Sequence, residues 1–332
     1  MNNFKKVGLT ALAGSLAAVS AHAAEMGVSG ASVLTYTSED STEVTGNPMG
    51  MKTNLSFTAS GDVNGYTVSY MQTSADQFAG MSSARLSLDM GDMGTVAFDQ
   101  GSGSGLATID DKTPTAAEEI WDGLDAVTAV GGLVGAAGNS GVFNYVNTMS
   151  DVTLNAAFRN GSATSNADGA SSNAGEGGWD FALTTNGSSM GVDGLAIGAG
   201  YGKKSIGTTG TTSGDEKHST VFANYSVGMV TFGYQVSDIN KPGDAGINES
   251  TDAWGIALNI NESLSVSYGE REVEYNNPTA TNVTESGEGI AIAYTMGSMK
   301  IAGNMNDVSN NDNATGAAAK DEMTEVAISF AF

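Results

Sequence analysis

Apolar and polar residues alternate along many short segments of this chain. The alternation is strictest at the C-terminal end, where Val326, Ile328, Phe330 and Phe332 fall on one side of an extended backbone and small or polar residues fall on the other. Successive side chains of a β-strand point to opposite faces, so a period of two predicts a strand with one apolar face. The chain is therefore expected to consist of strands, each of which places its apolar face against apolar surroundings.

The alternation predicts sixteen strands. They are expected near residues 26–37, 52–60, 65–74, 82–90, 94–100, 141–148, 151–159, 178–186, 194–204, 217–227, 229–237, 252–260, 263–273, 287–296, 298–306 and 322–332. The links between them are short and long in turn, and the short ones are rich in the Gly, Asn and Asp of tight turns. The long links are expected near residues 38–51, 75–81, 101–140, 160–177, 205–216, 238–251, 274–286 and 307–321. This layout is typical of an all-β, antiparallel transmembrane β-barrel. A second interpretation, with eighteen strands, places another strand pair within 101–140, where residues 127–134 are apolar.

The prolines give an independent test of this division. Pro48, Pro114, Pro242 and Pro278 all fall in predicted long loops and none in a predicted strand. Proline has no backbone N–H to donate to a neighbouring strand, so it is confined to the edges of sheets and to loops. Its absence from all sixteen segments agrees with a closed sheet.

The alternation alone does not say which way the apolar faces point, because a soluble sandwich turns them inward. Two features favour an outward direction: the opposite faces are small and polar, and the aromatic residues lie at two levels. Trp179 and Trp254 lie near the loop ends of their strands. Near the turn ends lie Tyr66, Tyr225, Tyr294, Phe330 and Phe332. Aromatic residues gather at the two interfaces between water and lipid, so the pattern predicts a barrel in a membrane.

The first residues have the three parts of a bacterial export signal. Lys5 and Lys6 precede an uncharged apolar run over 7–19, and Ala21-His22-Ala23 fits a cleavage site. The apolar run is too short to span a bilayer as a helix. We therefore expect cleavage after Ala23, and a single barrel domain over residues 24–332.

Charge and composition exclude several classes of function. Cleavage removes two lysines, so 11 basic and 37 acidic residues leave the mature chain with a net charge of −26. Such a chain repels phosphates, which argues against binding to nucleic acid. It contains no cysteine, and His218 is its only histidine after residue 23. This composition argues against thiolate or histidine metal sites and against a catalytic triad, so we expect a protein that is not an enzyme.

The loop over 101–140 is the candidate functional segment. A loop of this length without structure of its own is usually functional. It contains one lysine, Lys112, against six acids: Asp110, Asp111, Glu118, Glu119, Asp122 and Asp125. Thr115 and Glu118 have the spacing of a capping box just after Pro114, which predicts a short helix near 116–123. The alternative interpretation is an acidic surface loop in contact with solvent.

At this point the chain resembles the general porins of Gram-negative bacteria, particularly the alphaproteobacterial kind. The resemblance covers the mature chain and depends on the export signal, the rhythm of strands and loops, the terminal Phe332 and the long third loop. It implies a homotrimer in the outer membrane, surrounded by outer-membrane lipid and lipopolysaccharide, through which small hydrophilic solutes and ions diffuse passively. It also implies that Phe332, with Phe330, is read by the barrel-assembly machinery, and that the loop near 76–80 contacts another subunit.

The resemblance further implies that the third loop folds into the barrel and faces basic residues on the wall. The alternation of faces along each strand places four basic residues on the polar faces: Arg85, Lys52, Arg159 and Arg271. Arg85 lies farthest inside its strand. The excess of acids favours a preference for cations. No cofactor is expected, although carboxylates on long loops are also suited to Ca²⁺; no regular calcium motif occurs. The alternative functions are a substrate-specific outer-membrane channel and an exported β-rich adhesin or surface protein.

Overall fold

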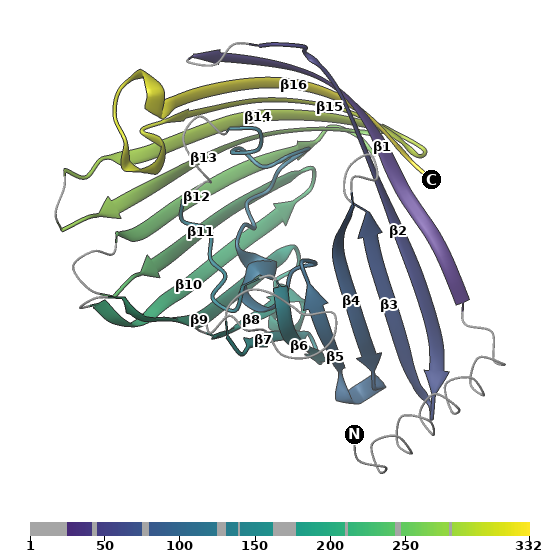
Figure 1. The fold of residues 1–332 in the computed structure, drawn as a ribbon. Helices are drawn as coiled ribbons and strands as arrows, with labels where there is room; N and C mark the ends of the chain where they lie inside the picture. The colour runs from purple at the N-terminus through teal and green to yellow at the C-terminus, as the bar shows by residue number, and fades with distance from the viewer. Residues whose placement is uncertain are drawn as a thin grey trace.

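The computed structural model describes residues 25–41, 45–74, 80–124, 131–138, 140–161, 177–209, 212–242, 247–278 and 281–332. These residues form one closed barrel of sixteen antiparallel strands (Figure 1). The predicted export signal over 1–23, the acidic residue Asp125 and most of the loop near 76–80 lie outside the described residues. Among the described residues, no helix is both long and apolar enough to cross a membrane.

The strands follow the predicted positions closely. They are β1 (Glu25–Ser41), β2 (Met49–Val63), β3 (Tyr66–Ser74), β4 (Met81–Asp89), β5 (Thr95–Gln100), β6 (Ser140–Met149), β7 (Val152–Arg159), β8 (Gly178–Asn186), β9 (Leu195–Thr209), β10 (Thr212–Val227), β11 (Val230–Asn240), β12 (Asn248–Asn259), β13 (Leu264–Asn276), β14 (Thr284–Met296), β15 (Met299–Ser309) and β16 (Lys320–Ala331). The sixteen-strand prediction is confirmed, and the eighteen-strand interpretation is wrong: the described part of the third loop contains no strand.

Each strand pairs with its neighbours in sequence, and β1 pairs with β16 to close the barrel. At the turn end of this seam, Gly30 and Phe332 exchange two backbone hydrogen bonds of 2.8 and 2.9 Å. Closure leaves no strand with an unpaired edge, which is the condition for a sheet in lipid. The C-terminal phenylalanine therefore takes part in closing the barrel.

The apolar faces point outward, as predicted. On β11, Phe232 and Tyr234 are 49% and 45% exposed, whereas Gln235 and Ser237, which follow on the opposite face, are each 3% exposed. The polar faces point into the barrel, where some of them are covered by the long third loop. A main apolar cluster lies between this loop and the wall and consists of Leu106, Ile109, Val134, Ala182, Phe222 and Ile239.

The largest departure from the predicted boundaries is at β9 and β10. These strands run to Thr209 and from Thr212, so most of the loop expected over 205–216 is a hairpin extension with a bulge between Ser213 and Asp215. Apart from Ile206, residues 205–216 are Ser, Thr, Gly, Asp and Glu, so neither face carries a row of apolar side chains. Because neither face is apolar, the period-two pattern disappears although the backbone pairing continues.

Candidate functional site

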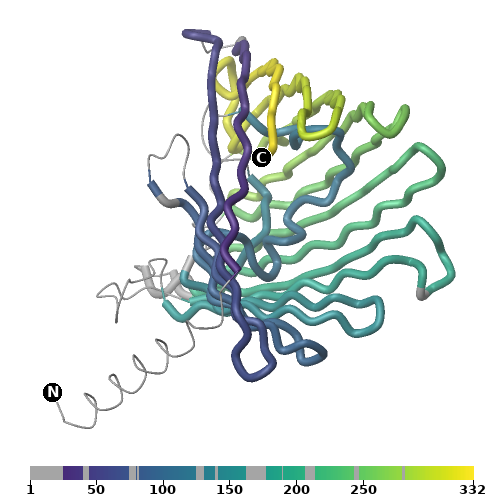
Figure 2. Tube along the Cα trace, turned by 90° about the vertical axis from the view of Figure 1, so that its right-hand side faces the viewer, coloured from purple at the N-terminus to yellow at the C-terminus, as the bar shows by residue number. Residues whose placement is uncertain are grey.

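The inner loop is defined as residues 101–139 between β5 and β6, and its described parts, 101–124 and 131–138, lie inside the barrel. The first limb of the loop runs along the inside of the wall from β8 to β15. The second limb returns along the same strands to β8. Figures 1 and 2 show this blue segment on the inner side of the green strands. The inward-folded third loop is therefore confirmed, and it narrows the space inside the barrel.

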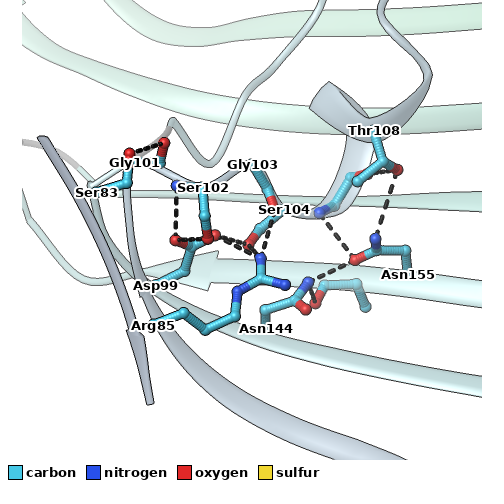
Figure 3. Close-up of polar contacts among 12 residues, drawn as sticks. Ser83, Arg85, Asp99, Gly101, Ser102, Gly103, Ser104, Thr108, Asn144 and Asn155 are labelled. Atoms are coloured by element: carbon cyan, nitrogen blue, oxygen red, sulfur yellow. Dashed lines mark hydrogen bonds and ion pairs between the residues drawn. The ribbon is translucent and has the colours of Figure 1, made fainter. Parts of the chain in front are cut away.

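The root of the inner loop is held by an ion pair between two neighbouring strands. Arg85 on β4 contacts the Asp99 carboxylate on β5 at 2.7 Å (Figure 3). The same Asp99 accepts hydrogen bonds from the hydroxyls of Ser102 and Ser104, and Arg85 donates to the carbonyl oxygen of Gly103. Arg85 thus lies on the inner wall, as parity predicted, but its charge is paired with a carboxylate that is 1% exposed.

Asp180 on β8 holds both limbs of the inner loop. One of its carboxylate oxygens accepts a hydrogen bond from the backbone N–H of Leu106 at 2.9 Å, and the other accepts one from Ala137 at 2.6 Å. The residue is 2% exposed. A carboxylate has two acceptor oxygens and no donor, so it is suited to bind two N–H groups at once. Sequence analysis did not single out Asp180.

Side chains on β10, β11, β13 and β15 hold the outgoing limb by its backbone. Gln235 accepts a hydrogen bond from Lys112 N–H at 2.6 Å and donates to the carbonyl oxygen of Ile109 at 2.9 Å. Farther along, Ser267 accepts from Ala116 N–H at 2.8 Å. The remaining contacts are Asn224 with the Lys112 carbonyl, and Asn306 with the Glu119 and Asp122 carbonyls. The polar inner face of the barrel therefore replaces the hydrogen bonds that secondary structure would give this segment.

The returning limb is held by charged and titratable groups. Glu249 accepts a hydrogen bond from Gly132 N–H at 2.6 Å, and Arg271 donates to the carbonyl oxygen of Gly131. Arg271 is also paired with Glu285 at 3.1 Å. Gly135 N–H donates to Nδ1 of His218 at 3.2 Å, and Nε2 of the same ring lies 2.8 Å from the Glu216 carboxylate.

The wall beneath the inner loop has glycines at several points where apolar residues of the loop touch it. A Cβ added at Gly200 would lie 2.3 Å from Leu106, one at Gly233 would lie 2.3 Å from Pro114, and one at Gly289 would lie 3.0 Å from Ile120. These distances are shorter than ordinary contacts between side chains. The missing side chains leave room for the apolar residues of the loop, so the loop lies directly against the backbone of the sheet.

We expect Gly200→Val to displace the outgoing limb into the lumen. The new methyl groups would overlap with Leu106, and overpacking of this kind costs roughly 1–3 kcal/mol of stability. The expected result is a lower single-channel conductance and unfolding at a lower temperature on heated gels. Gly61→Val on β2 is the control, because a Cβ there has no neighbour within 4 Å. Unchanged conductance in folded Gly200→Val would contradict this account.

The short helix predicted near 116–123 is absent. Residues 116–124 form bends and turns, with hydrogen bonds from Asp122 N–H to Glu119 and from Leu124 N–H to Trp121. The Thr115 hydroxyl donates to the Glu118 carbonyl instead of capping a helix. The capping-box prediction failed because the wall takes up the backbone groups that a helix would use. A short 3-10 helix, η3 (Gly105–Ile109), lies nearer the root.

The five acids in the described part of the inner loop fall into two groups. Glu118, Glu119 and Asp122 are exposed and face the lumen. Asp110 and Asp111 are half-buried against the wall, and burial raises the pKa of both carboxyls. Burial is also the largest cause that raises the pKa of Glu118, followed by the charges of Asp122 and Glu119. The lumen-facing group therefore concentrates negative charge at one edge of the inner loop.

The basic residues from the sequence prediction lie in different surroundings. Arg271 is 5% exposed beneath the inner loop, 5.3 Å from the ring centre of Trp121. Arg159 lies against Gly138 of the returning limb. Lys52 is exposed on the inner face of β2 and makes no ion pair within the described part of the chain. Arg159 also makes no ion pair within the described residues but is half-buried, so Lys52 is the exposed one of the four.

Two charged wall residues near Glu118 were missed. Lys300 on β15 and Glu325 on β16 both influence the Glu118 carboxyl electrostatically, and Thr37 donates a hydrogen bond to Glu325 at 3.0 Å. Both residues alternate with outward-facing apolar neighbours, so parity could have placed them on the inner face. Among the described residues, no group of three or more His, Cys, Asp or Glu side chains is arranged to hold a metal ion.

Solved structures with the same fold are bacterial outer-membrane proteins. OmpT, an outer membrane protein of Vibrio cholerae, superposes with a TM-score of 0.67 at 12% identity, over 93% of this chain and 98% of that one. An anion-selective porin from Comamonas acidovorans gives 0.66 at 13% identity, over 93% and 100%. The outer membrane channel DcaP of Acinetobacter baumannii gives 0.65 at 13% identity, over 93% and 97%. No protein-family model and no curated protein sequence matches the chain. At these identities the likeness establishes the fold alone.

Proposed function

We propose that this protein is a porin of the Gram-negative outer membrane that lets small hydrophilic solutes and ions diffuse passively. The observation that carries the proposal is the inner loop, fixed by both limbs to the polar inner wall of a closed barrel with an apolar outer surface. A wall of this kind forms a water-filled path, and a fixed loop within it sets the width of that path. The function is transport rather than catalysis, and we favour a general porin of the alphaproteobacterial kind.

The distribution of open charges supports a preference for cations. Glu118, Glu119 and Asp122 face the lumen from the inner loop, and Glu325 lies nearby on the wall. By contrast, Arg85 and Arg271 are paired with Asp99 and Glu285. Rings and edges of carboxylates favour cations in channels. Lys300 and Lys52 are the basic wall residues that oppose this field.

The proposal includes the assembly inferred from the resemblance. The barrel would form a homotrimer in outer-membrane lipid and lipopolysaccharide after export and removal of residues 1–23. Phe332 and Phe330, which are 66% and 49% exposed beside the β1–β16 seam, would be recognised by the barrel-assembly machinery.

Recording from single channels in a planar bilayer tests this function. The purified protein is expected to give conductance steps, with a reversal potential across a KCl gradient that favours K⁺. Steps that arrive in threes would support the trimer. Folded protein that gives no steps would rule out the diffusion pore, and a reversal potential that favours Cl⁻ would rule out the cation preference.

The cation preference is expected to weaken on acidification, beginning above the pH expected for an ordinary glutamate. A carboxyl with a raised pKa is charged well above that pKa and takes up a proton as the pH falls through it. The pKa of Glu118 is raised above the ordinary value of 4.5. In reversal potentials measured from pH 8 to pH 4, the midpoint of the decline should therefore lie above pH 4.5. In Glu118→Gln this midpoint should lie at a lower pH, and identical profiles would contradict the assignment to Glu118.

A further inference from the structure

A hollow of about 430 Å³ lies at the loop end of β11, β12 and β13, which pair side by side (Figure 1). Its volume is within the range of about 300–1,000 Å³ that is typical of small-molecule sites. Its lining comes from both faces of the sheet: Asp238, Ser250 and Glu274 from the outer face, and Glu249 and Tyr275 from the inner face. The hollow is therefore at the rim of the barrel, beside the entrance to the lumen.

The inner-face side of the hollow is held in place by the supports of the inner loop. Glu249 accepts a hydrogen bond from Gly132 N–H at 2.6 Å, and the Tyr275 hydroxyl donates to Glu285 at 2.6 Å. Both side chains are thus bound to fixed partners. A ligand in the hollow would meet a surface that is already ordered, which lowers the entropic cost of binding.

Two carboxylates flank a hydroxyl group across the outer-face side of the hollow. The register places Asp238 on β11 opposite Ser250 on β12, and Ser250 opposite Glu274 on β13. Neighbouring strands are about 4.8 Å apart, so the backbones that carry the two carboxylates are about 10 Å apart. Among the described side chains, no three acids are arranged to hold a metal ion. The row instead suits an elongated ligand with a positive group near each end and hydroxyl groups between.

The polar side chains of this row are free to bind a ligand. Asn240 and Asn276 add amide groups nearer the loops. Together with Asp238, Ser250 and Glu274, their side chains make no hydrogen bond or ion pair within the described part of the chain. An amide both donates and accepts, as does a hydroxyl group, whereas a carboxylate only accepts.

The lining carries an excess of negative charge. No Lys or Arg belongs to its described residues. The neighbouring Lys241 is paired with Glu249 at 2.5 Å, and Lys217, the register partner of Asn240, lies outside the lining. The charges of Asp238 and Glu274 are therefore left to attract a cation and to repel an anion.

We propose that this hollow binds a cationic, hydroxyl-bearing solute of the amino-sugar class at the entrance to the lumen. The ammonium groups of such a solute pair with Asp238 and Glu274 in charge-assisted hydrogen bonds. Its hydroxyls, each of which donates and accepts, pair with Ser250 and the two amides. Binding depends on the fold alone, whereas capture of the solute on its way into the pore rests on the proposed porin function.

Calorimetric titration of the purified barrel tests the site, in a detergent whose headgroup has neither sugar nor charge. The probes are the disaccharide of glucosamine with both amines protonated, its di-N-acetyl form, and a linear diamine of similar length. The glucosamine disaccharide is expected to bind at least tenfold more tightly than the N-acetylated form, which has the same ring hydroxyls and no charge. Equal binding of these two sugars would overturn the proposal.

Two double variants separate the charges from the hydroxyl contacts. Asp238→Asn with Glu274→Gln should weaken binding of the glucosamine disaccharide and of the diamine, each by about tenfold or more. Ser250→Ala with Asn276→Ala should weaken only the disaccharide, by about tenfold, because the diamine has no hydroxyl groups. Equal weakening of both probes by the second variant would contradict the amino-sugar assignment.

The matched control removes the same charge far from the hollow. Asp92→Asn with Asp151→Asn changes two exposed turns at the opposite end of the barrel and should leave binding unchanged. Equal losses in the two carboxylate variants would show attraction to overall charge and no site. Calorimetry does not require conduction, so binding by a barrel without conductance steps would keep the site and remove the porin function. Conductance steps without binding would do the reverse.

Discussion

Replacing Glu118, Glu119 and Asp122 together by lysine is expected to reverse the sign of the ion preference. The three carboxylates are exposed and face the lumen from one edge of the inner loop. The substitution changes the charge of these three neighbouring side chains by six units. At 0.1 M salt such charges act on ions in the lumen over about 10 Å, the Debye length. The reversal potential across a KCl gradient should move from favouring K⁺ to favouring Cl⁻, and the shift should become smaller at 1 M salt.

The matched control places the same change of charge outside the constriction. Asp92, Asp151 and Glu262 are exposed in three short turns at the opposite end of the barrel from the long loops. Lysine at these three positions changes the net charge of the chain equally but should leave the reversal potential nearly unchanged. Equal shifts in the two variants would show that the overall charge, and not the inner loop, sets the preference.

The barrel itself was predictable because lipid imposes a simple rule on every strand. Phe232, Tyr234 and Val236 all face outward, while the residues between them face the interior of the barrel. A one-residue slip would exchange these faces, so the pattern fixes both the strand and its register. The rule stops where the strands leave the lipid. The end of β9 near Thr209 carries polar residues on both faces and was therefore taken for a loop.

The contacts of the inner loop were not predictable in the same way. Parity placed Arg271 on the inner face correctly, but nothing local indicates that Glu285 and Gly131 cover it. Asp180 binds Leu106 and Ala137, which are 74 and 43 residues away in sequence. Contacts at these separations depend on how the closed barrel brings strands around one loop. Sequence alternation specifies the face of a residue but not its partner across the lumen.

Asp180→Ala is expected to release the inner loop and widen the pore. The substitution leaves the buried N–H groups of Leu106 and Ala137 without an acceptor, and each unsatisfied group costs about 1–3 kcal/mol. The loop can recover this free energy only by moving both limbs into water, away from β8. Single-channel conductance should rise, the current should become noisier, and larger sugars should pass in a liposome-swelling assay.

Two further variants separate release of the loop from damage to the barrel. Asp180→Asn keeps one acceptor oxygen but turns an NH₂ group toward the second backbone N–H, so its conductance should lie between those of the original protein and Asp180→Ala. Thr184→Ala, on the same inner face of β8 but without a bond to the loop, should conduct normally. All three variants should remain folded barrels on unheated gels, because the strand pairing does not involve the Asp180 side chain. If folded Asp180→Ala keeps both the original conductance and the original size limit, Asp180 does not set the width of the pore. The loop would then be held by its remaining contacts with Gln235, Ser267 and Glu249.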